Sequence, residues 1–264
     1  MGAGPAFDPV VFLDDLTAEA GELLVAEDPL EAELYGANLM AAGALFGEEF
    51  AEGLSGSIVP ALVRSSTAES VAVLFAIDAV ADGAGAGEAA RRLRETGVAV
   101  PGWVDELSAP VTMGFCRRYH DPVGEVSMLL GGFERAGRTH GFIVDVDHDD
   151  CDAAVLITLV PGSVLDDAPE IITDEARDTG VTLIAEELDP GEFRRQVERA
   201  LNARAVHDRG PALSAEVEAL DHDDIGSSYP WLAVLLRARI RTLPEPPRPP
   251  AAHGSGDGPD IRPR

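Results

Sequence analysis

The sequence predicts an α+β fold. An N-terminal helical layer packs on a four- to five-stranded antiparallel β-meander, followed by C-terminal helices and a disordered tail. Two observations support this: the spacing of apolar residues changes from about 3.6 to 2 after Pro110, and helical spacing returns once the strands end. Because helices and strands occupy separate stretches, the layers are segregated rather than alternating. The regions are a lead-in (1–12), helices (13–107), a sheet (110–187), further helices (188–243) and a Pro/Gly-rich tail (244–264), arranged as one domain or two lobes.

Helices in the first region follow from apolar residues three and four positions apart. They are expected over residues 15–27, 29–46, 57–64, 66–81 and 88–96. Ser66 and Glu69 have the spacing of a capping box, in which a hydroxyl and a carboxylate each satisfy a free amide at the helix start. The helix that follows is apolar on most sides, so we expect it to lie at the centre of the helical layer.

Strands are predicted where apolar and polar residues alternate, beginning with Met113, Phe115, Arg117 and Tyr119. Short turns separate four such stretches, which indicates an antiparallel meander. Residues 181–186 are a candidate fifth strand. Further helices are expected over residues 163–179, 190–205, 211–220 and 229–243.

Composition excludes several classes of protein. The 264 residues carry a net charge of −27, and all 20 basic residues are arginines. Without lysine there is no Walker-type phosphate site, Schiff-base enzyme or pyridoxal enzyme. The acidic excess argues against direct binding to nucleic acid. We expect no membrane span, no signal peptide and no disulfide framework, and therefore a cytoplasmic protein.

The main cluster of side chains that could bind a metal or take part in catalysis lies at the end of the third strand. It comprises Asp145, Asp147, His148 and Asp149, followed by Asp150, Cys151 and Asp152. Alternation along a strand puts Asp145 and Asp147 on one face, and the following residues can fold back toward them. Carboxylates with an imidazole suit Mg²⁺, Mn²⁺ or Zn²⁺. The simpler interpretation is a solvated turn, because aspartate bonds its own backbone there.

Cys116 is a second candidate. It lies beside Arg117, Arg118 and His120, whose positive charge would favour a reactive thiolate. The alternative is a small, half-buried residue without chemical function.

Three segments carry a recognisable pattern: residues 26–34, residues 97–103 (Gly-Val-Ala-Val-Pro-Gly-Trp) and residues 141–148, the strand that ends in Val-Asp-His. Together they resemble a family of uncharacterised cytoplasmic proteins of unknown function from high-GC actinobacteria. The resemblance covers residues 15–160. It implies no activity and no ligand.

Two functions are expected from these observations. The first is a non-enzymatic cytoplasmic interaction or regulatory protein with a protein partner and no cofactor, because catalytic signatures are missing and the Pro-rich tail can dock in extended form. The second is a metal-dependent hydrolase that uses Asp145, Asp147, His148 and Asp149 with a divalent metal. Mimicry of nucleic acid by the acidic surface is a third idea. The oligomeric state is left open.

Overall fold

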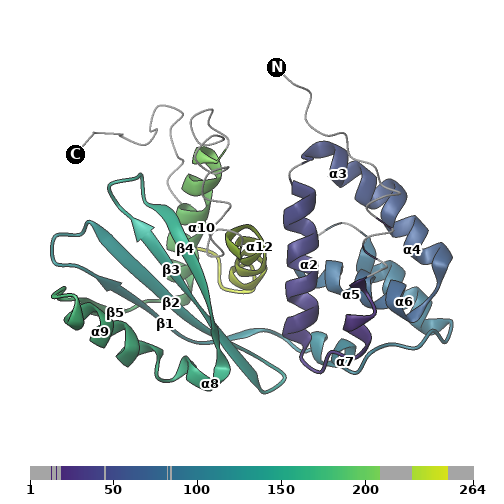
Figure 1. Cartoon of the computed structure of the whole chain (residues 1–264), viewed down its shortest axis with the longest axis horizontal. Helices are drawn as coiled ribbons and strands as arrows, with labels where there is room; N and C mark the ends of the chain where they lie inside the picture. The colour runs from purple at the N-terminus through teal and green to yellow at the C-terminus, as the bar shows by residue number, and fades with distance from the viewer. Residues whose placement is uncertain are drawn as a thin grey trace. The chain divides into compact units, whose positions relative to one another are not determined.

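The computed structural model describes residues 13, 16, 19–44, 46–81, 83, 85–208 and 228–248 (Figure 1). It confirms the α+β fold. The chain forms two compact units: residues 1–110 with 230–238, and residues 111–229 with 239–264. Among the described residues, no helix is long and apolar enough to cross a membrane.

The first unit is helical and has its own apolar core. Its elements are η1 (Glu22–Leu24), α2 (Pro29–Ala44), α3 (Glu48–Gly53), the π-helical turn η2 (Leu54–Ile58), α4 (Val59–Ser65), α5 (Ala68–Val80), α6 (Ala86–Glu95) and α7 (Trp103–Leu107). The central position predicted for the fourth helix is confirmed, because α5 is buried on nearly every side. The indole of Trp103 donates a 2.7 Å hydrogen bond to the carbonyl of Leu23 and so joins η1 to α7.

The start of α5 differs from the predicted capping box. Thr67, not Ser66, is the capping residue, and its hydroxyl accepts a 3.2 Å bond from the amide of Ser70. Ser66 instead ends α4 in a left-handed conformation, with φ of 51°. Because α4 continues to Ser65, Ser66 belongs to its C-terminus and cannot also begin the next helix.

The second unit is built on a five-stranded sheet. Its strands are β1 (Thr112–His120), β2 (Val126–Arg135), β3 (Arg138–Asp147), β4 (Ala153–Pro161) and β5 (Ile184–Glu187). They lie in the order β4-β3-β2-β1-β5, and every neighbouring pair is antiparallel. The predicted four-strand meander is confirmed. The fifth strand also exists, although it begins three residues later than the alternation suggested.

Helices from the same unit cover the sheet. α10 (Pro190–His207) lies on one face, where a Cβ built on Gly131 of β2 would lie 2.6 Å from the ring of Phe193. α8 (Gly162–Leu165) and α9 (Ala168–Asp178) lie on the other, where a Cβ on Gly141 would lie 2.4 Å from Leu165. The sequence predicted one helix over 163–179, whereas the structure divides it into these two.

The last described helix is α12 (Tyr229–Ile240). At its end the buried guanidinium of Arg239 donates a 2.9 Å bond to His140 on β3. The lead-in 1–12, the helix expected over 211–220 and the tail beyond residue 248 lie outside the described residues.

The close packing of α2 on α5 gives a test of the helical core. A Cβ on Gly36 would lie 2.1 Å from the backbone oxygen of Ala76, which cannot rotate away. We therefore expect Gly36→Ala to lower the free energy of unfolding by about 1–3 kcal/mol. Gly56→Ala is the control, since its Cβ would meet nothing within 4 Å. Urea denaturation of the two variants measures the difference, and equal loss in both would contradict this account.

Candidate functional site

The structure separates the metal ligands predicted from the sequence. Strand alternation turns Asp145 and Asp147 to the side of the sheet covered by α8 and α9, and His148 to the α10 side. The carboxylate of Asp147 accepts bonds from the amides of Asp149 and Asp150 at 2.8 and 3.2 Å, as in an Asx turn. Asp149 is exposed. The four residues are therefore not brought together as one ligand set.

Asp145 instead borders a hollow of about 380 Å³ on the α8–α9 side. Its neighbours across the sheet are Met128 on β2 and Leu156 on β4. Burial among apolar side chains raises the pKa of the Asp145 carboxyl.

Cys116 has surroundings unlike those of a reactive thiolate. The side chain is buried, and its thiol donates to the carbonyl of Leu188 at 3.1 Å. Burial, followed by the negative charges of Asp189 and Glu187, raises the pKa of Cys116 to about 11. The pKa of Cys116 is thus raised and not lowered, and the geometry supports the interpretation of Cys116 as a structural residue.

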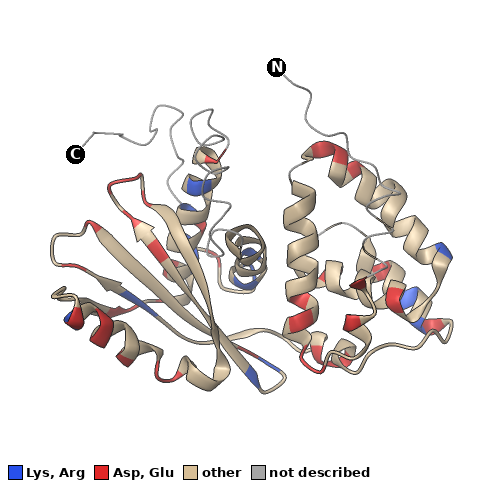
Figure 2. Cartoon of the chain, viewed as in Figure 1, with Lys and Arg blue, Asp and Glu red and all other residues tan. Residues whose placement is uncertain are grey.

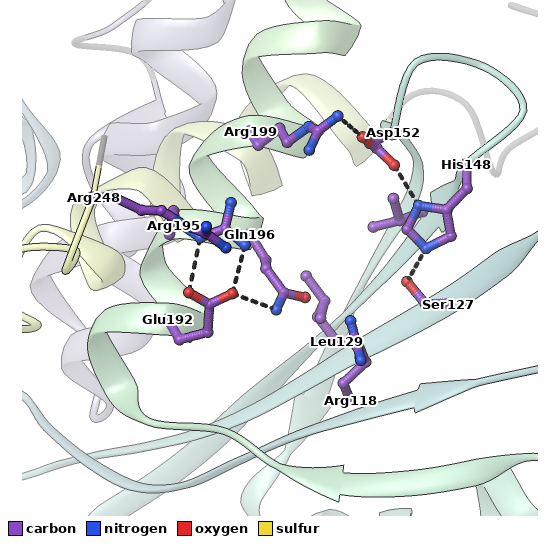
Figure 3. A pocket seen from close by; sticks show the side chains of 11 residues that line it. Arg118, Ser127, Leu129, His148, Asp152, Glu192, Arg195, Gln196, Arg199 and Arg248 are labelled. Atoms are coloured by element: carbon purple, nitrogen blue, oxygen red, sulfur yellow. Dashed lines mark hydrogen bonds and ion pairs between the residues drawn. The ribbon is translucent and has the colours of Figure 1, made fainter. Parts of the chain in front are cut away.

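The α10 side of the sheet holds a more polar pocket, which we call the arginine pocket (Figure 3). Its volume is about 250 Å³. It is lined by residues of the sheet, the β3–β4 turn, α10 and the segment after α12: Arg118, Ser127, Leu129, Val146, His148, Asp152, Glu192, Arg195, Gln196, Arg199 and Arg248.

One stripe of α10 supplies a wall of this pocket. Glu192, Arg195, Gln196 and Arg199 follow one another at helical spacing, so they share a face. Arg195 donates to both oxygens of Glu192, and Gln196 donates to the same carboxylate at 2.9 Å. The bonds from Arg195 are the main reason why the pKa of Glu192 is lowered to about 2. This set of bonds holds the guanidinium of Arg195 in place beside the cavity.

The opposite wall contains a chain of polar side chains that runs from the sheet to α10. Nε2 of His148 lies 3.0 Å from the hydroxyl of Ser127, and Nδ1 of His148 bonds the carboxylate of Asp152. Asp152 also pairs with Arg199 (Figure 3). Because a carboxylate only accepts, Nδ1 carries the proton of a neutral His148, and Nε2 then accepts from Ser127.

The backbone of the β3–β4 turn directs Asp152 toward His148. Cys151 and Asp152 both have left-handed conformations, with φ of 58° and 61°. Consecutive non-glycine residues seldom adopt this conformation, and such strain is frequent where a side chain must be held for function. The turn therefore fixes the carboxylate that orients the histidine.

The charge of the pocket is opposite to that of the chain. Four arginines and two carboxylates line it, which gives a formal charge of +2 apart from His148. The chain as a whole carries a net charge of −27, and Asp and Glu residues are spread over the described helices and strand ends (Figure 2). The buried Nε of Arg118 has no hydrogen-bond partner within the described part of the chain. The lining is thus suited to a small anion.

Asp152 belongs to the Asp/His cluster predicted from the sequence, but Ser127 and the arginines of α10 were not among the predicted site residues. The helical spacing of Glu192, Arg195 and Arg199 was a usable signal. No sequence signal joins Ser127 to His148, because their contact depends on the register that pairs Ser127 with Val146.

No family model, curated protein or solved structure matches this chain. The resemblance to actinobacterial proteins therefore stays a prediction, and the function is argued from the geometry of the site alone.

The lowered pKa of Glu192 predicts a pH-dependent contribution to stability. It is fully present above the ordinary pKa of 4.5 and is lost as the pH falls toward 2. Because the side chain is partly exposed, we expect Glu192→Gln to cost about 1 kcal/mol at about pH 7 and roughly half as much at about pH 3. Urea denaturation at both pH values checks this. Glu170→Gln, an exposed glutamate on α9, is the control, and an equal cost for Glu192→Gln at both pH values would contradict the prediction.

Proposed function

We propose that this protein is a non-enzymatic regulatory protein that binds a small anionic molecule in the arginine pocket. The observation that carries the proposal is the positive lining of a cavity in a strongly acidic chain. The positive lining would repel a cationic ligand, whereas carboxylate or phosphate oxygens match the planar donors of the guanidinium groups.

Three of the four arginines are already ordered by partners within the protein. Arg195 is held by Glu192, Arg199 by Asp152 and Arg118 by Glu186. Each guanidinium has five N–H donors, so one ion pair leaves others for a ligand. A ligand that meets ordered donors loses less conformational entropy from the side chains on binding. Pairing within the lining therefore prepares the pocket for an anion.

The volume limits the size of the ligand. About 250 Å³ lies just below the usual range of pockets for drug-sized molecules. A phosphate monoester or a small dicarboxylate fits this volume and the charge of the lining. Nucleic acid does not fit, since the rest of the surface would repel it.

The two functions expected from the sequence differ in their support. A regulatory role agrees with a small-molecule site, and binding to a protein partner remains part of the proposal. The metal-dependent hydrolase required Asp145, Asp147, His148 and Asp149 to meet, and they lie on different faces or in solvent, so the geometry does not support it.

Anion binding is tested by calorimetry with inorganic phosphate, phenyl phosphate and succinate. We expect at least one to bind, more weakly as salt increases, and with affinity reduced by about tenfold in Arg199→Gln and in Arg248→Gln. Arg177→Gln removes the same charge from an exposed site on α9 and should bind like the wild type. Failure of all three anions to bind, or equal affinity in all variants, would overturn the proposal.

The series of hydrogen bonds from Ser127 through His148 to Asp152 favours a second candidate function for the same pocket, which is hydrolysis of an anionic ester. Ser127, His148 and Asp152 have the roles of nucleophile, base and orienting carboxylate. The Ser127 oxygen would bond the ester carbonyl carbon as its proton passes to Nε2 of His148. His148 would then give this proton to the departing alkoxide as the carbon–oxygen bond breaks, and water would release the acid by the reverse steps.

A fluorophosphonate probe distinguishes this activity from binding alone. We expect covalent labelling of the wild type at Ser127, observed by mass spectrometry, and none in Ser127→Ala or His148→Ala. Ser163→Ala, which changes an exposed serine of α8, should label normally. Absence of labelling in the wild type, or unchanged labelling in Ser127→Ala, would show that the hydrogen bonds among Ser127, His148 and Asp152 have only a structural role.

A further inference from the structure

Three side chains of different chemistry meet where the β3–β4 turn approaches the C-terminal end of α10. They are Asp150 and Cys151 from the turn and His207 from the last turn of the helix. One ligating atom of each lies within 4.8 Å of the other two. Within the described residues, this is the group of histidine, cysteine and carboxylate side chains that could hold a metal ion.

Two of these three side chains are already in contact with each other. Nδ1 of His207 lies 3.3 Å from Oδ2 of Asp150, and the imidazole is buried, with 4% of its side chain exposed. The other oxygen of Asp150, Oδ1, is buried and has no hydrogen-bond partner among the residues that the structure describes. A buried carboxylate oxygen without a donor is costly, and a cation at this point would satisfy it.

The combination of donors selects the metal. Mg²⁺ and Ca²⁺ prefer oxygen ligands alone, whereas Zn²⁺ accepts thiolate, imidazole and carboxylate ligands. We propose that Asp150, Cys151 and His207 bind Zn²⁺ as three protein ligands, with a fourth position open to water or to another ligand. This set is different from the four residues predicted from the sequence.

The distances require only local adjustment. In a tetrahedral zinc site, ligand atoms are about 3.3–3.8 Å apart. The observed separations of up to 4.8 Å would shorten by about 1 Å when the metal binds. Two of the ligands are adjacent on a turn and the third is at a helix end, so side-chain rotation can supply this movement.

Zinc here would also order the neighbouring pocket. Cys151 directly precedes Asp152, which bonds both His148 and Arg199. A metal that joins the turn to α10 would limit the movement of the two walls of the arginine pocket relative to each other. It would not contact an anion bound in that pocket. The zinc site stands on its own observations and does not depend on the proposed anion binding.

Cobalt is the probe for this site because Co²⁺ bound to thiolate has a charge-transfer absorption in the near ultraviolet, and tetrahedral Co²⁺ has intense visible bands. The full chain, with both cysteines reduced, is titrated with Co²⁺ in buffer with excess Mg²⁺, which occupies exposed carboxylates. We expect one equivalent of Co²⁺ to give both absorptions and one equivalent of Zn²⁺ to remove them.

The variants assign the ligands. Cys151→Ser should abolish the charge-transfer band and weaken Zn²⁺ binding by more than about tenfold. Cys116→Ser, which changes the buried cysteine away from the site, should keep the band. Because His207 is buried and its replacement can impair folding, Asp150→Asn is the second ligand variant and should weaken Zn²⁺ without removing the band. No band in the wild type, or a band that persists in Cys151→Ser, would overturn the proposal.

Discussion

The connection between the β3–β4 turn and α10 is the constraint on which the candidate chemistry of this molecule depends. Asp152 pairs with Arg199, and Asp150 lies beside His207, so two aspartates of one turn meet two residues of one helix. These contacts hold His148, which belongs to the same turn, against Ser127 on the sheet. If the turn moved away from α10, the polar chain, the wall of the arginine pocket and the group around Cys151 would all be lost together.

The connection between the β3–β4 turn and α10 depends on the chemistry of arginine, because the chain contains no lysine. A lysine would offer a single charged point on a flexible stem, whereas a guanidinium holds a carboxylate with one edge and still presents other donors. On α10, Arg195 and Arg199 are fixed by carboxylates and also border the cavity. The acidic excess of the chain thus has a structural use here, because some of its carboxylates orient the few cations that form a site.

The sequence predicted the architecture better than the site, for physical reasons. Alternation along β1 to β4 and the all-round apolar character of α5 are local signals, and the structure confirms both. The same alternation already placed Asp145 on the side opposite His148, but we expected the turn to fold back. It does not, because Asp147 uses its carboxylate to bond the backbone of the turn. The contact of Ser127 with His148 depends on strand register, and that of Asp150 with His207 on where α10 ends against the sheet, neither of which a single sequence specifies.

Gly131 shows how a residue outside the lining can control the dimensions of the arginine pocket. The absence of its side chain lets the ring of Phe193 rest directly on β2, and Phe193 is adjacent in sequence to Glu192. Any larger residue at this position would lift the first turns of α10 from the strands and widen the space beneath its polar stripe. The contact between Gly131 and Phe193 therefore limits the depth of the cavity, and with it the size of the anion that we propose it binds.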